Sequence, residues 1–173
     1  MFARLTALLL VAFAVAFSMP AMAQSAPKIA VVDFQSAIQQ TKEGQAAQKK
    51  LDAAFAQKKA SLDQLEAQLR QMKADYDKQA SILSDTARKA KEQELMNANS
   101  QYQQAYAQSE QDMQSMYNQT MQNLLDKLKM ITTQVGKEKG YTLVIEKAAV
   151  VFAVDGIDIT SEVVKRYDAS TGG

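Results

Sequence analysis

The side chains best suited to bind another molecule are tyrosines and methionines that lie between residues 102 and 121. Methionine is unbranched and tyrosine is amphipathic, so both can pack against many different apolar shapes. The members of this cluster are Tyr102, Tyr106, Met113, Met116, Tyr117 and Met121. One interpretation is a promiscuous surface for unfolded chains, and the other is an ordinary seam between packed helices.

The spacing within the cluster separates two groups. Four members follow the apolar repeat of a long helix, where such residues usually form the core: Tyr102, Tyr106, Met113 and Met116. Tyr117 and Met121 fall off that repeat, and Ile82 lies in a short polar interruption. We therefore expect Ile82, Tyr117 and Met121 to be the main candidates for binding an unfolded chain, with the four repeat residues as weaker candidates.

The sequence contains no constellation of residues typical of catalysis or metal binding. Without His or Cys it can form no His or Cys metal site, no thiol nucleophile and no Ser-His-Asp triad. No phosphate-binding loop is visible. Asp33 and Asp158 occupy places where a turn or a helix cap needs an acceptor. The sequence predicts a protein that is not an enzyme and that uses no metal or cofactor.

The first 23 residues have the pattern of an export signal. Arg4 precedes the apolar run Leu5–Phe17, and Ala21–Ala23 has the A-x-A pattern of a cleavage site. The alternative is a membrane anchor, but the run is shorter than the ~20 residues that span a bilayer. We predict cleavage after Ala23 and, for an exported chain without Cys, residence in a bacterial periplasm.

The charges of the exported chain balance. The whole sequence has 20 Lys and Arg against 19 Asp and Glu, and Arg4 is the only charge in the signal. Nucleic-acid binders normally show a basic excess, so that class of partner is disfavoured. The stretch Arg70–Glu92 has two more basic than acidic residues. This small excess indicates either a weak contact with an anionic membrane surface or an ordinary solvated helix face.

A long segment without helix breakers must position the tyrosine and methionine cluster. No Pro follows Pro27, and no Gly lies between Gly44 and Gly136. The residues between these glycines are mostly good helix formers. A single rod of this length would measure roughly 137 Å, so we expect a hairpin arm over residues 43–139.

The expected tip of the arm lies near residues 81–86, where Ser84 or Asp85 can cap a new helix. The first helix follows the heptad repeat of a coiled coil: Leu51, Phe55, Leu62, Leu65, Leu69, Met72, Tyr76 and Leu83. The second helix has polar or small residues on its repeat, at Asn99, Ser109 and Thr120. We expect this diluted seam to pack loosely and to let the arm bend.

The two ends of the chain are expected to form one small α+β body from residues 28–42 and 140–168. Strands are predicted at Lys28–Phe34, Tyr141–Glu146 and Ala149–Val154, and helices at Gln35–Thr41 and Ser161–Tyr167. A body of so few residues rarely folds alone. We therefore expect several copies to combine their strands into one barrel or sandwich. The residues expected in that oligomerisation body are Val31, Val32, Leu143, Ile145, Val151 and Phe152.

Four segments follow one another in the chain: Lys28–Asp33, the long hairpin, Gly140–Ile145, and Asp158–Thr160 before Val163–Lys165. Their order resembles that of the Skp/OmpH family of periplasmic chaperones. The resemblance covers essentially the whole mature chain. It implies a jellyfish-like homotrimer in which a small β-barrel body carries three coiled-coil hairpin arms around a cavity. It also implies an ATP-independent holdase that binds unfolded outer-membrane proteins in that cavity and prevents their aggregation before membrane insertion.

The sequence also departs from the family pattern. The best-known members are strongly basic, whereas this mature chain is neutral, so attraction to acidic clients and anionic lipid should be weaker here. The family's proposed lipopolysaccharide contact uses basic residues on the second helix, but residues 95–125 contain no Lys or Arg. We therefore do not assign that contact. The alternative function is a structural coiled-coil spacer or adaptor of the cell envelope, although a spacer should have tighter seams.

Overall fold

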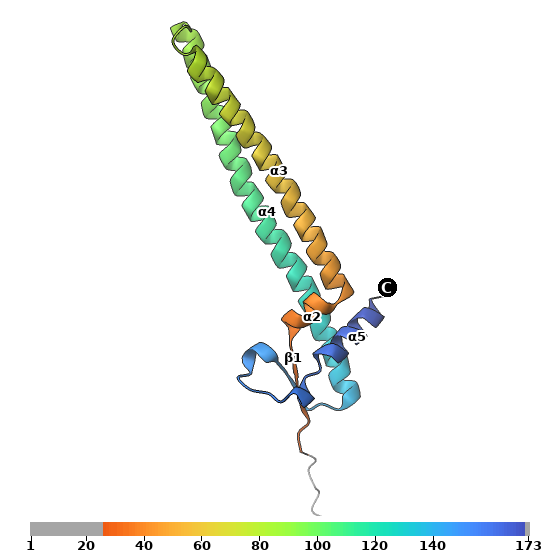
Figure 1. Cartoon of the computed structure of the whole chain (residues 1–173). Coiled ribbons are helices and arrows are strands. Elements are labelled where there is room, and N and C mark those ends of the chain that lie inside the picture. The colour runs from red at the N-terminus through yellow and green to blue at the C-terminus, as the bar shows by residue number, and fades with distance from the viewer. Residues whose placement is uncertain (1–25, 172–173) are drawn as a thin grey trace, which may run out of the picture.

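The computed structural model describes residues 26–171, and the predicted signal at residues 1–23 lies outside them. A small body carries a long helical hairpin, the arm, which projects from one side of it (Figure 1). This part of the chain is mostly helical, with two short strands, and the expected α+β class and hairpin arm are both present.

The arm consists of α3 (Lys42–Gln79) and α4 (Asp85–Lys139). Each helix begins at a hydroxyl cap, because the side chains of Thr41 and Ser84 accept hydrogen bonds from the N–H three residues on, at 3.1 and 3.3 Å. The turn at residues 80–84 forms the tip. The predicted helix start at Ser84 is confirmed.

Helix α4 is longer than α3, and its final turns enter the body (Figure 1). It ends at Gly140, which has φ 67° and donates its N–H to the carbonyls of Gly136 and Lys137. A left-handed residue at a helix end favours glycine, because a Cβ is strained there. The helix stop expected at Gly140 is therefore confirmed.

The body contains a two-stranded parallel sheet. Strand β1 (Ile29–Val32) pairs with β2 (Leu143–Glu146), so that Ile29 lies opposite Leu143 and Val32 lies opposite Glu146. The remaining elements of the body are α2 (Phe34–Gln40), the 3-10 turns η1 (Lys147–Ala149) and η2 (Asp155–Ile157), and α5 (Thr160–Ser170). The helices predicted after β1 and near the C-terminus are thus confirmed within a few residues.

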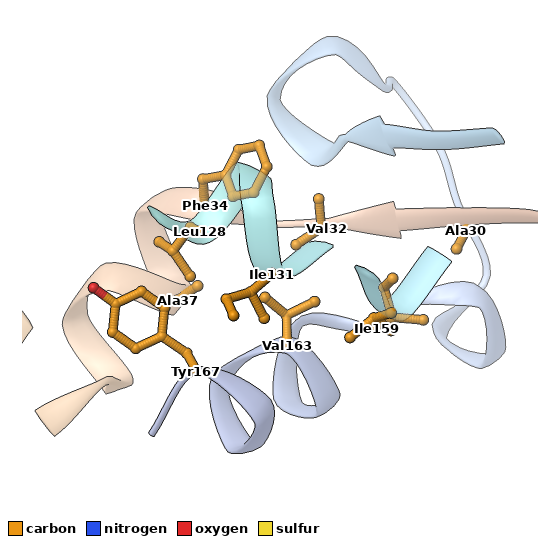
Figure 2. Packing of buried hydrophobic residues seen from close by; sticks show 10 residues of the cluster. Ala30, Val32, Phe34, Ala37, Leu128, Ile131, Ile159, Val163 and Tyr167 are labelled. Atoms are coloured by element: carbon orange, nitrogen blue, oxygen red, sulfur yellow. The ribbon is translucent and has the colours of Figure 1, made fainter. Parts of the chain in front are cut away.

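One hydrophobic core joins the body to the root of the arm (Figure 2). The core residues are Ala30, Val32, Phe34, Ala37, Leu128, Ile131, Val135, Ile159, Val163 and Tyr167. Three of them, Leu128, Ile131 and Val135, come from α4. The last turns of the arm therefore supply apolar area that the short strands of the body cannot supply alone.

The prediction of a third strand over Ala149–Val154 is wrong. The chain forms η1 and then runs irregularly, with Val151 106% exposed and Phe152 81% exposed. Strand β1 is occupied by β2 and by a single bridge between Val31 and Asp158. Apolar, β-branched residues favour a strand only where a neighbouring strand pairs with them. The described part of the chain forms no closed barrel.

Candidate functional site

The middle of α4 presents an almost uncharged surface. Between residues 95 and 125 its only charged residues are Glu110 and Asp112. Lys58 of α3 pairs with Asp112 at 2.7 Å between Nζ and Oδ2. This bond, with a second from Gln108, lowers the pKa of the Asp112 carboxyl. The rest of the surface is mainly amide, hydroxyl, tyrosine and methionine, and it produces little field to attract charged ligands.

Most residues of the repeat predicted on α4 are buried or half-buried, but the seam differs from the prediction at positions 99 and 106. Ala98 and Ala105 are half-buried and Ser109 is buried, whereas Asn99 and Tyr106 are exposed. Small residues in a seam let two helix backbones approach closely. Because the seam uses Ala105 in place of position 106, Tyr106 points outward and is 46% exposed. The expectation that Tyr106 packs in the seam is therefore wrong. The other predicted seam residues of the cluster are half-buried: Tyr102, Met113 and Met116.

A cleft of about 390 Å³ lies where α2 and the start of α3 meet α4. Its apolar lining comes from Ile38, Tyr117 and Met121. The cleft exists because α2 lies directly against the first turn of α3. A Cβ at Gly44 would lie 1.8 Å from the carbonyl oxygen of Ile38, so this approach requires glycine.

A second cleft, of about 630 Å³, continues along the same face of the arm. Its apolar lining comes from Phe55, Met113 and Tyr117. Tyr117 lines both clefts, so we treat them as one groove, the Tyr117 groove. Its apolar floor is formed by Ile38, Phe55, Met113, Tyr117 and Met121.

Other predicted binding residues lie away from this groove. Met116 lines a separate cleft of about 370 Å³ together with Leu51 and Leu124. Ile82 is 83% exposed at the tip, at the opposite end of the arm from the body. Of the seven predicted binding residues, the structure brings together Tyr117, Met121 and Met113.

Two floor residues of the groove were not identified from the sequence. The heptad spacing places Phe55 in the helix seam, and Ile38 lies in the short helix predicted for the body. A signal was present in the sequence, because Gly44 stands shortly after that helix, and a glycine early in a long helix often marks a close approach of another backbone. The six-residue spacing to Ile38, however, does not reveal which backbone approaches.

A polar junction joins three helices at the root of the arm. The Glu43 carboxylate accepts hydrogen bonds from Lys127 Nζ at 2.5 Å and from the Tyr167 hydroxyl at 2.8 Å. The bond from Lys127 is the main reason that the pKa of Glu43 is lowered. Burial, and then the bond to Glu43, raise the pKa of Tyr167. The junction ties α3, α4 and α5 together.

The body carries a second exposed apolar surface. The large apolar residues exposed there are Ile29, Leu143, Val151, Phe152 and Val154. Of the predicted oligomerisation residues, Val31 and Val32 are buried within the chain and Ile145 is half-buried, whereas the others are exposed. Several apolar side chains exposed in one small body are typical of an interaction surface.

Two features are absent from residues 26–171. No group of three acidic, His or Cys side chains there is arranged to hold a metal ion. Among the helices of this region, none is both long enough and apolar enough to cross a membrane.

Residues 28–167 match the family model described as outer membrane protein (OmpH-like), so the chain belongs to this family. Its members are periplasmic chaperones rather than enzymes. The predicted membership of the Skp/OmpH family and the prediction that the chain is not an enzyme are confirmed.

Curated relatives agree with this assignment at low identity. The chain is 27% identical over 154 residues to the chaperone protein Skp of Photorhabdus luminescens, covering 89% of this chain and 93% of that protein. It is 26% identical over 146 residues to Skp of Pectobacterium atrosepticum, covering 84% and 88%. A segment of 47 residues is 49% identical to outer membrane protein 26 of Haemophilus influenzae, covering 27% and 24%.

A solved structure shows the same fold. It is a putative outer membrane chaperone (OmpH-like) from Caulobacter crescentus CB15, with a TM-score of 0.78 and 18% sequence identity. The similarity covers 84% of this chain and 86% of that one. At this identity the comparison supports the fold alone.

Proposed function

We propose that this protein is an ATP-independent periplasmic holdase that binds unfolded outer-membrane proteins and prevents their aggregation before membrane insertion. Membership of a family of periplasmic chaperones supports the class of activity. The proposal includes export and cleavage of the signal after Ala23, which leaves the arm and body as the mature protein.

The observation that carries the proposal is the Tyr117 groove beside the nearly uncharged middle of α4. Tyr117 is 45% exposed, and its neighbours in the groove are the flexible side chains Met113 and Met121. An apolar surface that is open along its length can contact many sequences, because methionine adapts to different shapes. Such contacts suit a client that has no fixed structure.

We further propose that three copies assemble through their bodies and enclose the client between their arms. The exposed side chains of Leu143, Val151 and Phe152 support an interface between copies. The largely exposed segment 149–154 would pack against the neighbouring copy. Assembly would thereby bury the apolar surface that a single body leaves open.

The experiment is an aggregation assay with an unfolded outer-membrane β-barrel protein, in the absence of nucleotide. The purified mature protein should suppress light scattering at stoichiometric amounts. A structural spacer would leave the scattering unchanged, and that result would overturn the proposal. Addition of ATP should have no effect, because the described residues and the sequence offer no phosphate-binding loop.

A further inference from the structure

We propose that the Tyr117 groove binds client segments in an extended conformation, with alternating apolar and uncharged polar side chains. This inference rests on the proposed holdase function and names the kind of segment that the arm recognises. The alternation is also the pattern of a membrane-spanning β-strand.

The length of the groove fits a short extended segment. Its floor on α4 runs from Met113 to Met121, and its lining begins at Glu110. At 1.5 Å per residue, the helix from Glu110 to Met121 extends over about 16 Å. An extended chain rises about 3.3 Å per residue, so about five residues fit. Alternate side chains point to one side of such a chain, so two or three of them can reach the apolar floor.

The rim of the groove is built from amides. Six glutamines line the two clefts: Gln35, Gln39, Gln45, Gln48, Gln111 and Gln114. Each primary amide offers two N–H donors and a carbonyl acceptor. An extended backbone has N–H and C=O groups to satisfy along both edges, whereas a helix has already paired most of its own. A rim of amides therefore favours an extended ligand.

Several rim amides are held in position by bonds within the chain. Gln45 Nε2 donates to the backbone carbonyl of Gln39 at 3.3 Å, and Gln114 Nε2 donates to Asn118 Oδ1 at 2.9 Å. Gln48 Nε2 donates to Asp52 Oδ1 at 2.8 Å. In each case the glutamine carbonyl oxygen remains to accept an N–H from a bound backbone. Fixed acceptors lose less side-chain entropy on binding than free ones.

The apolar floor of the groove disfavours charged side chains. Lys49 and Glu110 are the charged residues that line the two clefts, and they lie in different clefts. A charged side chain placed on the floor between them would lose its water without gaining an ion pair. The polar members of the bound segment should therefore be uncharged.

The test compares two fluorescent peptides with the same uncharged composition. In one, apolar residues alternate with Ser, Thr and Asn, and in the other the apolar residues stand in one block. Anisotropy titrations with the full mature chain should give a Kd at least about fivefold lower for the alternating peptide, a difference near 1 kcal/mol.

Two variants assign this preference to the groove. Tyr117→Ser should raise the Kd of the alternating peptide about fivefold, whereas the matched change Tyr106→Ser should not, because Tyr106 has the same exposure but lines neither cleft. The double variant Gln39→Ala and Gln111→Ala should reduce the preference for the alternating peptide while helicity is kept. Equal affinity of the wild type for the two peptides would overturn the inference, and so would an equal effect of the two tyrosine changes.

The outcome separates this inference from the proposed function. The same wild-type preparation is tested for suppression of aggregation. Suppression without discrimination between the peptides overturns the groove proposal and leaves the holdase proposal in place. Discrimination without suppression supports the groove as a site for extended chains and overturns the holdase proposal.

Discussion

At the scale of single residues, the Asp158 carboxylate joins three segments of the body. Its Oδ2 accepts from Lys147 Nζ at 2.7 Å, and its Oδ1 accepts from the Thr160 N–H at 2.9 Å. Its backbone bridges Val31 of β1. Burial alone would raise the pKa of this carboxyl, but the hydrogen bonds from Lys147 and Thr160 outweigh burial and hold it at about 2.

This shift predicts how the stability of the body depends on pH. Because the folded pKa lies below the unfolded value of about 3.9, the ionised carboxylate stabilises the fold above about pH 4. That stabilisation is lost as the pH falls toward 2. Asp158→Asn should lower the free energy of unfolding by roughly 2 kcal/mol at neutral pH, and the deficit should shrink toward pH 2. Urea unfolding at several pH values measures it.

The control for this change is Asp155→Asn, which alters an exposed carboxylate in η2. It should change the stability by less than about 0.5 kcal/mol at any pH. A deficit of Asp158→Asn that stayed constant from neutral to acid pH would contradict the assigned role of the Asp158 ion pair.

A second residue-scale prediction concerns the joint between α2 and α3. Gly44→Ala places a Cβ against the carbonyl oxygen of Ile38, so it should destabilise the fold by about 1–3 kcal/mol. The matched change Gly136→Ala adds a Cβ at 3.6 Å from Val144 Cγ2, an ordinary contact, and should be neutral or stabilising. Thermal unfolding followed by circular dichroism compares them. Equal melting temperatures for the two variants would show that the joint is not tight.

At the scale of elements, the seam between the two helices of the arm contains an unsatisfied polar group in the middle of α4. The Ser109 hydroxyl is buried in the seam and has no hydrogen-bond partner within the described residues. An unsatisfied buried hydroxyl costs roughly 1–3 kcal/mol. Together with Ala98 and Ala105, it leaves little apolar area between the helices, so this part of the arm should open most easily.

Ser109→Ala should therefore stabilise the arm, because it removes the unpaired hydroxyl and raises helix propensity. The gain should be about 1 kcal/mol larger than that of Ser115→Ala, an exposed serine on the same helix. Hydrogen exchange of the amides in the middle of α4 reports the local stability. Equal protection in the two variants would mean that Ser109 is not a weak point.

The hairpin was predictable because its determinants are local. The absence of Gly and Pro between Gly44 and Gly136 favours helix throughout, and Ser84 marks the new start. Two positions of the set on α4 that faces α3 were not predictable. Either the larger residues Asn99 and Tyr106 or the small residues Ala98 and Ala105 could face α3, because the two pairs lie one position apart on the helix. Close packing favours the two alanines. The groove depends on α2 lying against α3, a contact that no repeat encodes.

At the scale of the whole molecule, the body exposes several large apolar side chains, which is typical of an interaction surface. Val151 and Phe152 have the residue types of a buried strand, but the described residues offer segment 149–154 no strand to pair with. Residue types indicate that a segment favours burial, but they do not specify whether the same chain or another one covers it.

Val151→Asp tests the role of this surface in assembly. It should reduce the oligomer to monomers in sedimentation, because an unpaired carboxylate in an apolar interface costs several kcal/mol. The secondary structure should persist, since Val151 makes no contribution to the core of the single chain. Ile82→Asp, an equally apolar-to-charged change at the arm tip, should leave the mass unchanged. An unchanged mass for Val151→Asp would exclude this surface as the interface.

We expect apolar contacts along the arm, rather than charge, to hold the client. The most direct measurement is the affinity for an unfolded outer-membrane β-barrel protein at low and at high salt, for the wild type and for Ile82, Tyr117 and Met121 changed together to Ser. Each buried apolar side chain is worth at most about 1.5–3 kcal/mol, so the triple change should weaken binding far more than any single change. Salt should change the affinity little, because screening acts on charge. Unchanged affinity in the triple variant, together with a steep dependence on salt, would contradict the account.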